Sequence, residues 1–146
     1  MKLAHQITIS MFLKPEEDRQ VGERSFHEFL SFLSPDEQER FIIKKVSKGF
    51  HERDILVLSA ELTKEKHTSR LLALLKERLS GAQKQQLREQ ADRLDEQFHF
   101  FLRFRKQDLP RLVLTDGGDC LHLKISLAVF PKRRDRALAL VEEIFS

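Results

Sequence analysis

The sequence predicts an α+β protein whose amphipathic helices pack on one face of an antiparallel-rich mixed sheet. Three observations predict this class. Apolar and polar residues alternate over several short segments, most clearly over 121–129, which is typical of strands with one buried face. Apolar residues recur at helical spacing in the segments between them. Short turns join consecutive strands, which favours antiparallel pairing. The expected order is β-α-β-β-α-α-β-β-β-α, in a single domain over residues 1–146.

The individual elements are placed by these two periodicities and by local capping signals. His5 is expected in phase with the buried side of the first strand, and Val21 on the apolar stripe of the first helix. Ser34 and Ser80 each precede a Glu or Gln by three residues, which is the spacing of a capping box. The expected elements are strand 4–13, helix 18–33, a short helical turn after Ser34, strands 40–47 and 54–63, a helical hairpin over 64–95, strands 98–105, 112–114 and 121–129, and a last helix that opens at Pro131.

Charge is unevenly distributed along the chain. The formal net charge is only +3, from 26 Lys and Arg against 23 Asp and Glu. Residues 16–39 carry eight acids and two bases, whereas residues 40–53 carry five bases and one acid. Residues 98–146 have nine bases and six acids. Such segregation favours a protein whose basic side meets a polyanion, although solvated surface charge without a partner is the alternative.

Several function classes are disfavoured by the sequence. No apolar run is long enough to span a membrane and no secretion signal is evident, so a cytoplasmic protein is expected. The single cysteine, Cys120, permits no internal disulfide. The six histidines lack the close pairs that metal sites use, and no glycine-rich phosphate loop is present. We therefore expect no enzyme, no metal site and no cofactor.

RNA binding is the function that the basic residues favour. If the helices cover one face of the sheet, the opposite face displays Arg103, Arg105, His122 and Lys124. Lysine and arginine bind RNA through its phosphates. Phe101 and the loop residue Phe50 are candidates for stacking on bases, although packing in the core or at a sheet edge is favoured for both. The predicted RNA contacts are Lys44, Lys48, Arg53, Arg103, Arg105, Lys106, Lys124, Lys132, Arg133 and Arg134 to phosphates, and Gln107 to a base or sugar.

Several short motifs occur in a fixed order: the opening strand His5-x-Ile7, the turn Lys48-Gly49-Phe50-His51, the segment Phe101-Leu102-Arg103-Phe104-x-Lys106-Gln107, Gly118-Asp119, and Phe130-Pro131. This series resembles a known family of small archaeal proteins, described as predicted exosome subunits or RNA-binding proteins. The resemblance implies a fold similar to that of the ribosomal protein that holds the small rRNA in the large subunit. It also implies RNA as a partner, together with exosome or ribosome-related proteins. Arg105 stands where the family typically has an acid, which should strengthen attraction to phosphates.

Two alternatives from other classes stay open. The acidic helix 18–33 could dock on a basic partner, which would make the chain a protein–protein adaptor. A more remote alternative is a metal-dependent ribonuclease that uses Asp116, Asp119 and His122, because paired carboxylates beside a histidine can perform acid–base chemistry.

Overall fold

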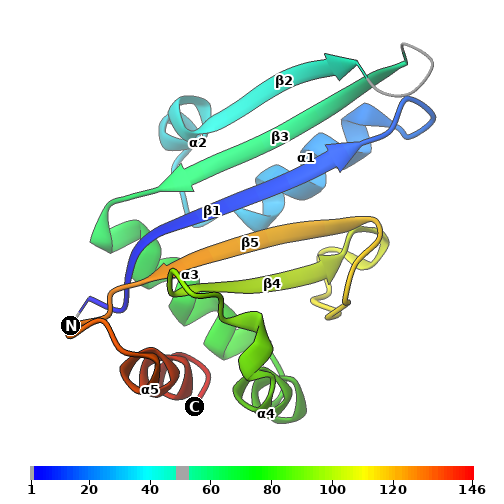
Figure 1. Ribbon diagram of the computed structural model, residues 1–146. Helices are drawn as coiled ribbons and strands as arrows, with labels where there is room; N and C mark the ends of the chain where they lie inside the picture. The colour runs from blue at the N-terminus through cyan, green and yellow to red at the C-terminus, as the bar shows by residue number, and fades with distance from the viewer. Residues whose placement is uncertain (1, 49–52) are drawn as a thin grey trace. The chain divides into compact units, whose positions relative to one another are not determined.

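The α+β class is confirmed by the computed structural model, which describes residues 2–48 and 53–146. Five strands form an antiparallel sheet in the order β2-β3-β1-β5-β4. The strands are β1 Ala4–Leu13, β2 Ile42–Lys48, β3 Asp54–Leu62, β4 His99–Arg105 and β5 Cys120–Leu127. The helices are α1 Arg19–Phe29, α2 Pro35–Phe41, α3 Glu65–Arg78, α4 Gly81–Glu89 and α5 Arg134–Ile144 (Figure 1). None of the helices in the two described ranges has both the length and the apolar character needed to cross a membrane.

The chain divides into two compact units, each assembled from separate segments. Strands β1, β4 and β5 contribute residues to both units, although the sequence predicts a single domain. Unit 1 consists of Met1–Ile7, Leu62–Leu102 and Lys124–Ser146, and unit 2 of Thr8–Glu61 and Arg103–Leu123.

In unit 2, helix α1 covers one face of the strands. Figure 1 shows α1 behind β1 and β3. The ring of Phe29 on α1 lies 6.5 Å from that of Phe104 on β4, centroid to centroid. Apolar residues that alternate along the strands are buried on this face, and burial of such side chains is the main force that holds sheet and helix together. They include Ile9, Met11, Leu13, Leu56, Leu58, Ala60, Leu121 and Leu123 from the strands, and Phe26, Phe29, Leu30 and Leu33 from α1 and the residues after it.

The apolar stripe of α1 differs from the expected one by a single residue. Val21 is 53% exposed, so its predicted place on the stripe is wrong. Gly22 is buried instead, and a Cβ atom there would lie only 2.4 Å from Cδ2 of Leu13. The missing side chain therefore allows α1 to approach β1 closely. Asp18 caps this helix, because its carboxylate accepts hydrogen bonds from the backbone N–H groups of Gln20 and Val21.

Three further expectations need correction. His5 is exposed, because the alternation along β1 changes phase between Ala4 and Ile7, which are both buried. Residues 112–114 form no full strand, and their pairing is limited to an isolated bridge between Leu114 and Phe104. The last helix begins at Arg134, three residues later than expected. Both predicted capping boxes, at Ser34 and Ser80, are present.

In unit 1, helix α5 contacts the hairpin formed by α3 and α4. The ring of Phe145, at the end of α5, lies 5.7 Å from that of Phe100 on β4. Arg88 on α4 donates a hydrogen bond to the backbone carbonyl of Phe145 and forms an ion pair with Glu142 at 3.6 Å. The helical hairpin and the last helix thus enclose an apolar core, as their periodicity predicts.

Candidate functional site

The strand face of unit 2 opposite α1 is polar, basic and partly aromatic; we call it the open face. Its residues alternate with the buried ones, because successive side chains of a strand point to opposite sides of a sheet. Lys45 belongs to it because its Cα pairs with that of Val57, which is out of phase with the buried Leu56 and Leu58. The main side chains of the open face are Ser10 and Phe12 on β1, Lys45 on β2, Val57 and Ser59 on β3, Arg103 and Arg105 on β4, and Cys120 and His122 on β5.

Arg103 lies on the open face at the edge strand β4, beside β5. The hydrogen bond from the backbone N–H of Lys106 to the carbonyl of Asp119, at 3.2 Å, sets the register between β4 and β5. Because the strands are antiparallel, counting three residues back from Lys106 and three residues forward from Asp119 places Arg103 opposite His122. Within the part of the chain that the structure describes, Arg103 forms no ion pair. Its guanidinium can therefore bind an anion without first breaking an internal contact.

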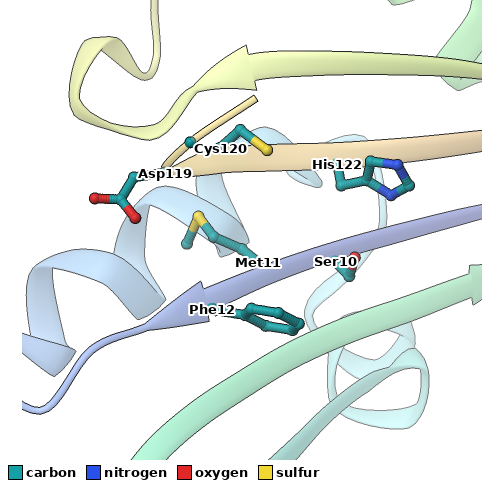
Figure 2. Close-up of a pocket in the computed structure, with 7 residues that line it drawn as sticks. Ser10, Met11, Phe12, Asp119, Cys120 and His122 are labelled. Carbon is teal, nitrogen blue, oxygen red and sulfur yellow. The ribbon is translucent and has the colours of Figure 1, made fainter. Parts of the chain in front are cut away.

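A hollow of about 270 Å³ lies on the open face between β1 and the start of β5. Figure 2 shows Ser10 and Phe12 on β1 across from Cys120 and His122 on β5, with Asp119 at one end. Phe12 is 60% exposed. Sequence reasoning missed this residue, although the signal was present: Phe12 is a large apolar side chain on the side of the strand that carries Thr8 and Ser10.

The thiol of Cys120 does not have the properties of a catalytic nucleophile. Burial raises its pKa, and the carboxylate of Asp119 raises it further. The positive charges of Arg103 and Lys106 lower the pKa but do not offset burial. Since the thiolate is the reactive form of cysteine, this thiol stays protonated and unreactive near neutral pH.

The predicted contacts on β2 and the adjoining turn are directed away from the open face or are engaged by acids. Lys44 pairs in register with the buried Leu58, so it lies on the side covered by α1, and its Nζ is 3.3 Å from Oε1 of Glu23. Lys48 shares that side and lies 3.0 Å from Asp54. Arg53 forms a 3.5 Å ion pair with Glu16 on the exposed surface, and Phe50 falls outside the described residues. The phosphate contacts predicted for these bases thus require them to exchange an internal partner.

Lys106 is placed as a structural residue, in contrast to its predicted role at the surface. Only 8% of its side chain is exposed. Its Nζ donates to the carboxylate of Glu17 and to the backbone carbonyl of Phe12, both at 2.7 Å. The neighbouring residues Arg105 and Gln107 are exposed, and Arg105 lies 3.3 Å from Asp108.

The remaining predicted contacts lie in unit 1. Lys124 is half-buried on β5, two residues beyond His122 and therefore in phase with it. Lys132 is exposed, and Arg133 lies 3.2 Å from Asp135. Arg134 donates hydrogen bonds to the backbone carbonyls at positions 91 and 94, at 2.9 and 3.4 Å, which gives it a structural role at the end of the helical hairpin. Phe101 is half-buried and packs edge-on against His99.

The carboxylates of the ribonuclease alternative are not assembled into a metal site. Asp119 lies 2.7 Å from Nζ of Lys14. This hydrogen bond lowers the pKa of Asp119 below 3.8, although burial opposes the effect. No cluster of three or more metal-ligating side chains occurs in residues 2–48 or 53–146.

The adaptor alternative uses the acidic helix as a docking surface. Two of its acids already have internal roles: Asp18 caps α1, and Glu23 forms an ion pair with Lys44.

We expect the Lys14–Asp119 pair to make stability depend on acid pH. Because the folded-state pKa of Asp119 is lowered, its contribution is present above the unfolded pKa of about 4 and is lost as the pH falls through the lower folded value. Asp119→Asn should cost at most about 1 kcal/mol at neutral pH, since the pair is partly exposed. Urea unfolding at about pH 7, 5 and 3 should show the variant approaching wild-type stability at the lowest pH. A deficit that is constant across this range would contradict the assignment.

Together these features define a class: a small α+β protein whose unit 2 has one helix-covered sheet face and an open face with an exposed aromatic ring and an arginine that forms no ion pair among residues 2–48 and 53–146. The model of the protein family described as "RNA binding" matches residues 6–127, and the chain belongs to this family.

Archaeal proteins are similar over nearly the whole length. The chain is 30% identical over 144 residues to RNA-binding protein PAB1135 of Pyrococcus abyssi, which covers 96% of this chain and 92% of that protein. AF2318 from Archaeoglobus fulgidus, of family DUF54, is 26% identical, with a TM-score of 0.80 over 97% of this chain and 99% of that one. Mth689, a DUF54 protein from Methanothermobacter thermautotrophicus, shares the fold at 23% identity, with a TM-score of 0.77 and 99% of each chain covered.

Proposed function

We propose that this protein binds RNA through phosphate contacts on the open face of unit 2 and performs no reaction on it. We further propose that it acts in the archaeal cytoplasm as an accessory of RNA processing or degradation, in association with the exosome. Membership of the RNA-binding family and the name of the Pyrococcus relative support the first part. Co-purification of exosome subunits with the tagged protein from its own cells tests the second part, and their absence would contradict it.

The observation that carries the RNA proposal is the position of Arg103. It projects from β4, an edge strand, on the sheet face that no helix of unit 2 covers, and it has no acidic partner in the described ranges. Arg105 and Lys45 add positive charge to the same face. A phosphate near Arg103 would gain a charge-assisted hydrogen bond and release condensed counterions without the cost of breaking an ion pair.

The other predicted contacts fall into two groups according to what they already bind. Lys106 and Arg134 donate hydrogen bonds within the fold, so a phosphate contact by either residue would compete with these bonds. The other group stays available to RNA, with Lys44 and Lys48 reaching it from the side of the sheet opposite the open face, because exposed ion pairs are worth at most about 1 kcal/mol and a phosphate can replace the carboxylate. That group consists of Lys44, Lys48, Arg53, Arg105 and Arg133, which pair with acids, and of Gln107, Lys124 and Lys132, for which the described chain shows no ion pair.

Affinity for RNA should fall steeply with salt. With about three to five phosphate contacts, the slope of log K against log salt concentration is expected to be about −2 to −4 for a single strand. Fluorescence anisotropy with a labelled oligonucleotide, over about 50 to 400 mM KCl, measures this slope. A flat response, or no binding at the lowest salt concentration, would contradict the proposed function.

A further inference from the structure

The hollow beside Phe12 has the chemistry of a nucleobase site, and we infer that it binds one unpaired base of single-stranded RNA. This inference rests on the proposed RNA binding and narrows it to a class of RNA. Pockets for drug-sized ligands measure roughly 300–1,000 Å³. A hollow of about 270 Å³ therefore suits one planar ring system, with its backbone left outside.

Phe12 supplies the stacking surface. It belongs to β1, which has β3 on one side and β5 on the other, so its 60% exposure does not result from a place on an edge strand. The position of its backbone is held, because the carbonyl of Phe12 accepts a hydrogen bond from Lys106, whose side chain is only 8% exposed. Aromatic side chains that are exposed and held in place stack on the bases of single-stranded RNA.

The rim of the hollow carries groups that can meet the edge of a base. Ser10 offers a hydroxyl, which donates and accepts, and the imidazole of His122 also lines the hollow. Cys120 keeps a neutral thiol, because burial raises its pKa, and so adds no negative charge there. Gly118 lines the hollow without a side chain, and a Cβ atom at this position would contact nothing within 4 Å. The hollow therefore combines an apolar surface with a few polar atoms.

The charge beside the hollow favours a nucleotide over a neutral ring. Arg103 lies opposite His122 on the neighbouring strand, so the phosphate attached to a base in the hollow would be within reach of a guanidinium that no acid of the described chain engages. In a duplex the bases are paired and stacked inside the helix, and A-form RNA presents mainly phosphates and 2′-hydroxyls to a protein. Only an unpaired base can enter the hollow, and we therefore expect single strands to bind more tightly than duplexes.

The test compares the full chain with Phe12→Ala, using a labelled uridine-rich RNA of about 12 nucleotides and the duplex with its complement. Loss of one stacking contact should weaken single-strand binding about 5- to 100-fold. Affinity for the duplex should change less than twofold, and Phe12→Tyr should retain single-strand binding. Val21→Ala is the matched control, because Val21 is also about half exposed in unit 2 but lies on α1. It should leave both affinities unchanged.

The outcomes separate the two proposals. If wild-type protein binds neither RNA, the proposed function fails. If it binds with a steep salt dependence but Phe12→Ala matches the control, or if the duplex binds as tightly as the single strand, the base site is wrong and the proposed function stands. Photocrosslinking of wild-type protein with 5-iodouridine RNA tests the site even if Phe12→Ala does not fold. We expect a crosslink to Phe12, and crosslinks confined to other residues would overturn the inference.

Discussion

Replacing Arg103 and Arg105 with glutamate is expected to abolish detectable RNA binding, with a loss of at least about 100-fold near 100 mM salt. Both side chains leave β4 on the open face, so the exchange converts its most basic strand into an acidic one. Each substitution removes a cation that attracts phosphate and adds an anion that repels it. The loss should be largest at low salt, because screening weakens attraction and repulsion alike.

The variant should remain folded. Arg103 has no ion pair in the described part of the chain, and Arg105 is 54% exposed, with a single partner, Asp108. Thermal unfolding followed by circular dichroism provides the check. The matched control is Arg19→Glu with Arg24→Glu, which changes the net charge equally but on exposed positions of α1, the helix on the other face. If the control loses RNA binding to the same degree, net charge decides the affinity and the open face is not the binding surface.

The faces of the sheet could be predicted from the sequence because their signals are local and repeated. Burial of one face imposes a period of two on a strand, so the alternation on both sides of Arg103 and His122 is enough to place them together on the other face. The two capping boxes were predictable for the same reason, since each depends on residues three positions apart. The apolar stripe of α1 was predicted with one wrong residue because Gly22 has no apolar side chain to mark it as buried. Only the close approach of Leu13 in the structure shows that Gly22 faces the sheet.

The fate of several cations could not be predicted, because the acids that engage them come from distant parts of the chain. Lys106 and Glu17 are 89 residues apart, and Lys14 and Asp119 are 105 residues apart. No periodicity relates such positions. The sequence alone therefore does not distinguish a lysine with a structural partner from a lysine that faces solvent. Lys44 shows a subtler limit: adjacent lysines of one strand face opposite sides, and only the register with β3 shows that Lys45 is on the open face.

Lys106→Met is expected to lower the free energy of unfolding by about 2–4 kcal/mol, a large effect for a lysine. The substitution keeps an unbranched side chain of similar length but removes the donor. The carboxylate of Glu17, 29% exposed on its side chain, and the carbonyl of Phe12 then each lose the hydrogen bond from a side chain that is only 8% exposed. Chemical denaturation measures the loss, and Lys132→Met, at an exposed position of unit 1, should change stability by less than about 0.5 kcal/mol.

A double-mutant cycle then separates a structural lysine from a phosphate ligand. Glu17→Gln combined with Lys106→Met should lose less stability than the sum of the two single variants, because the second substitution removes the charge that the first left unpaired. The salt slope of RNA binding, measured where Lys106→Met is fully folded, should equal that of wild type, because no phosphate contact has been removed. The opposite result would be a slope of log K against log salt concentration that is smaller in magnitude by about one, together with stability like that of the Lys132→Met control. It would show that Lys106 contacts RNA.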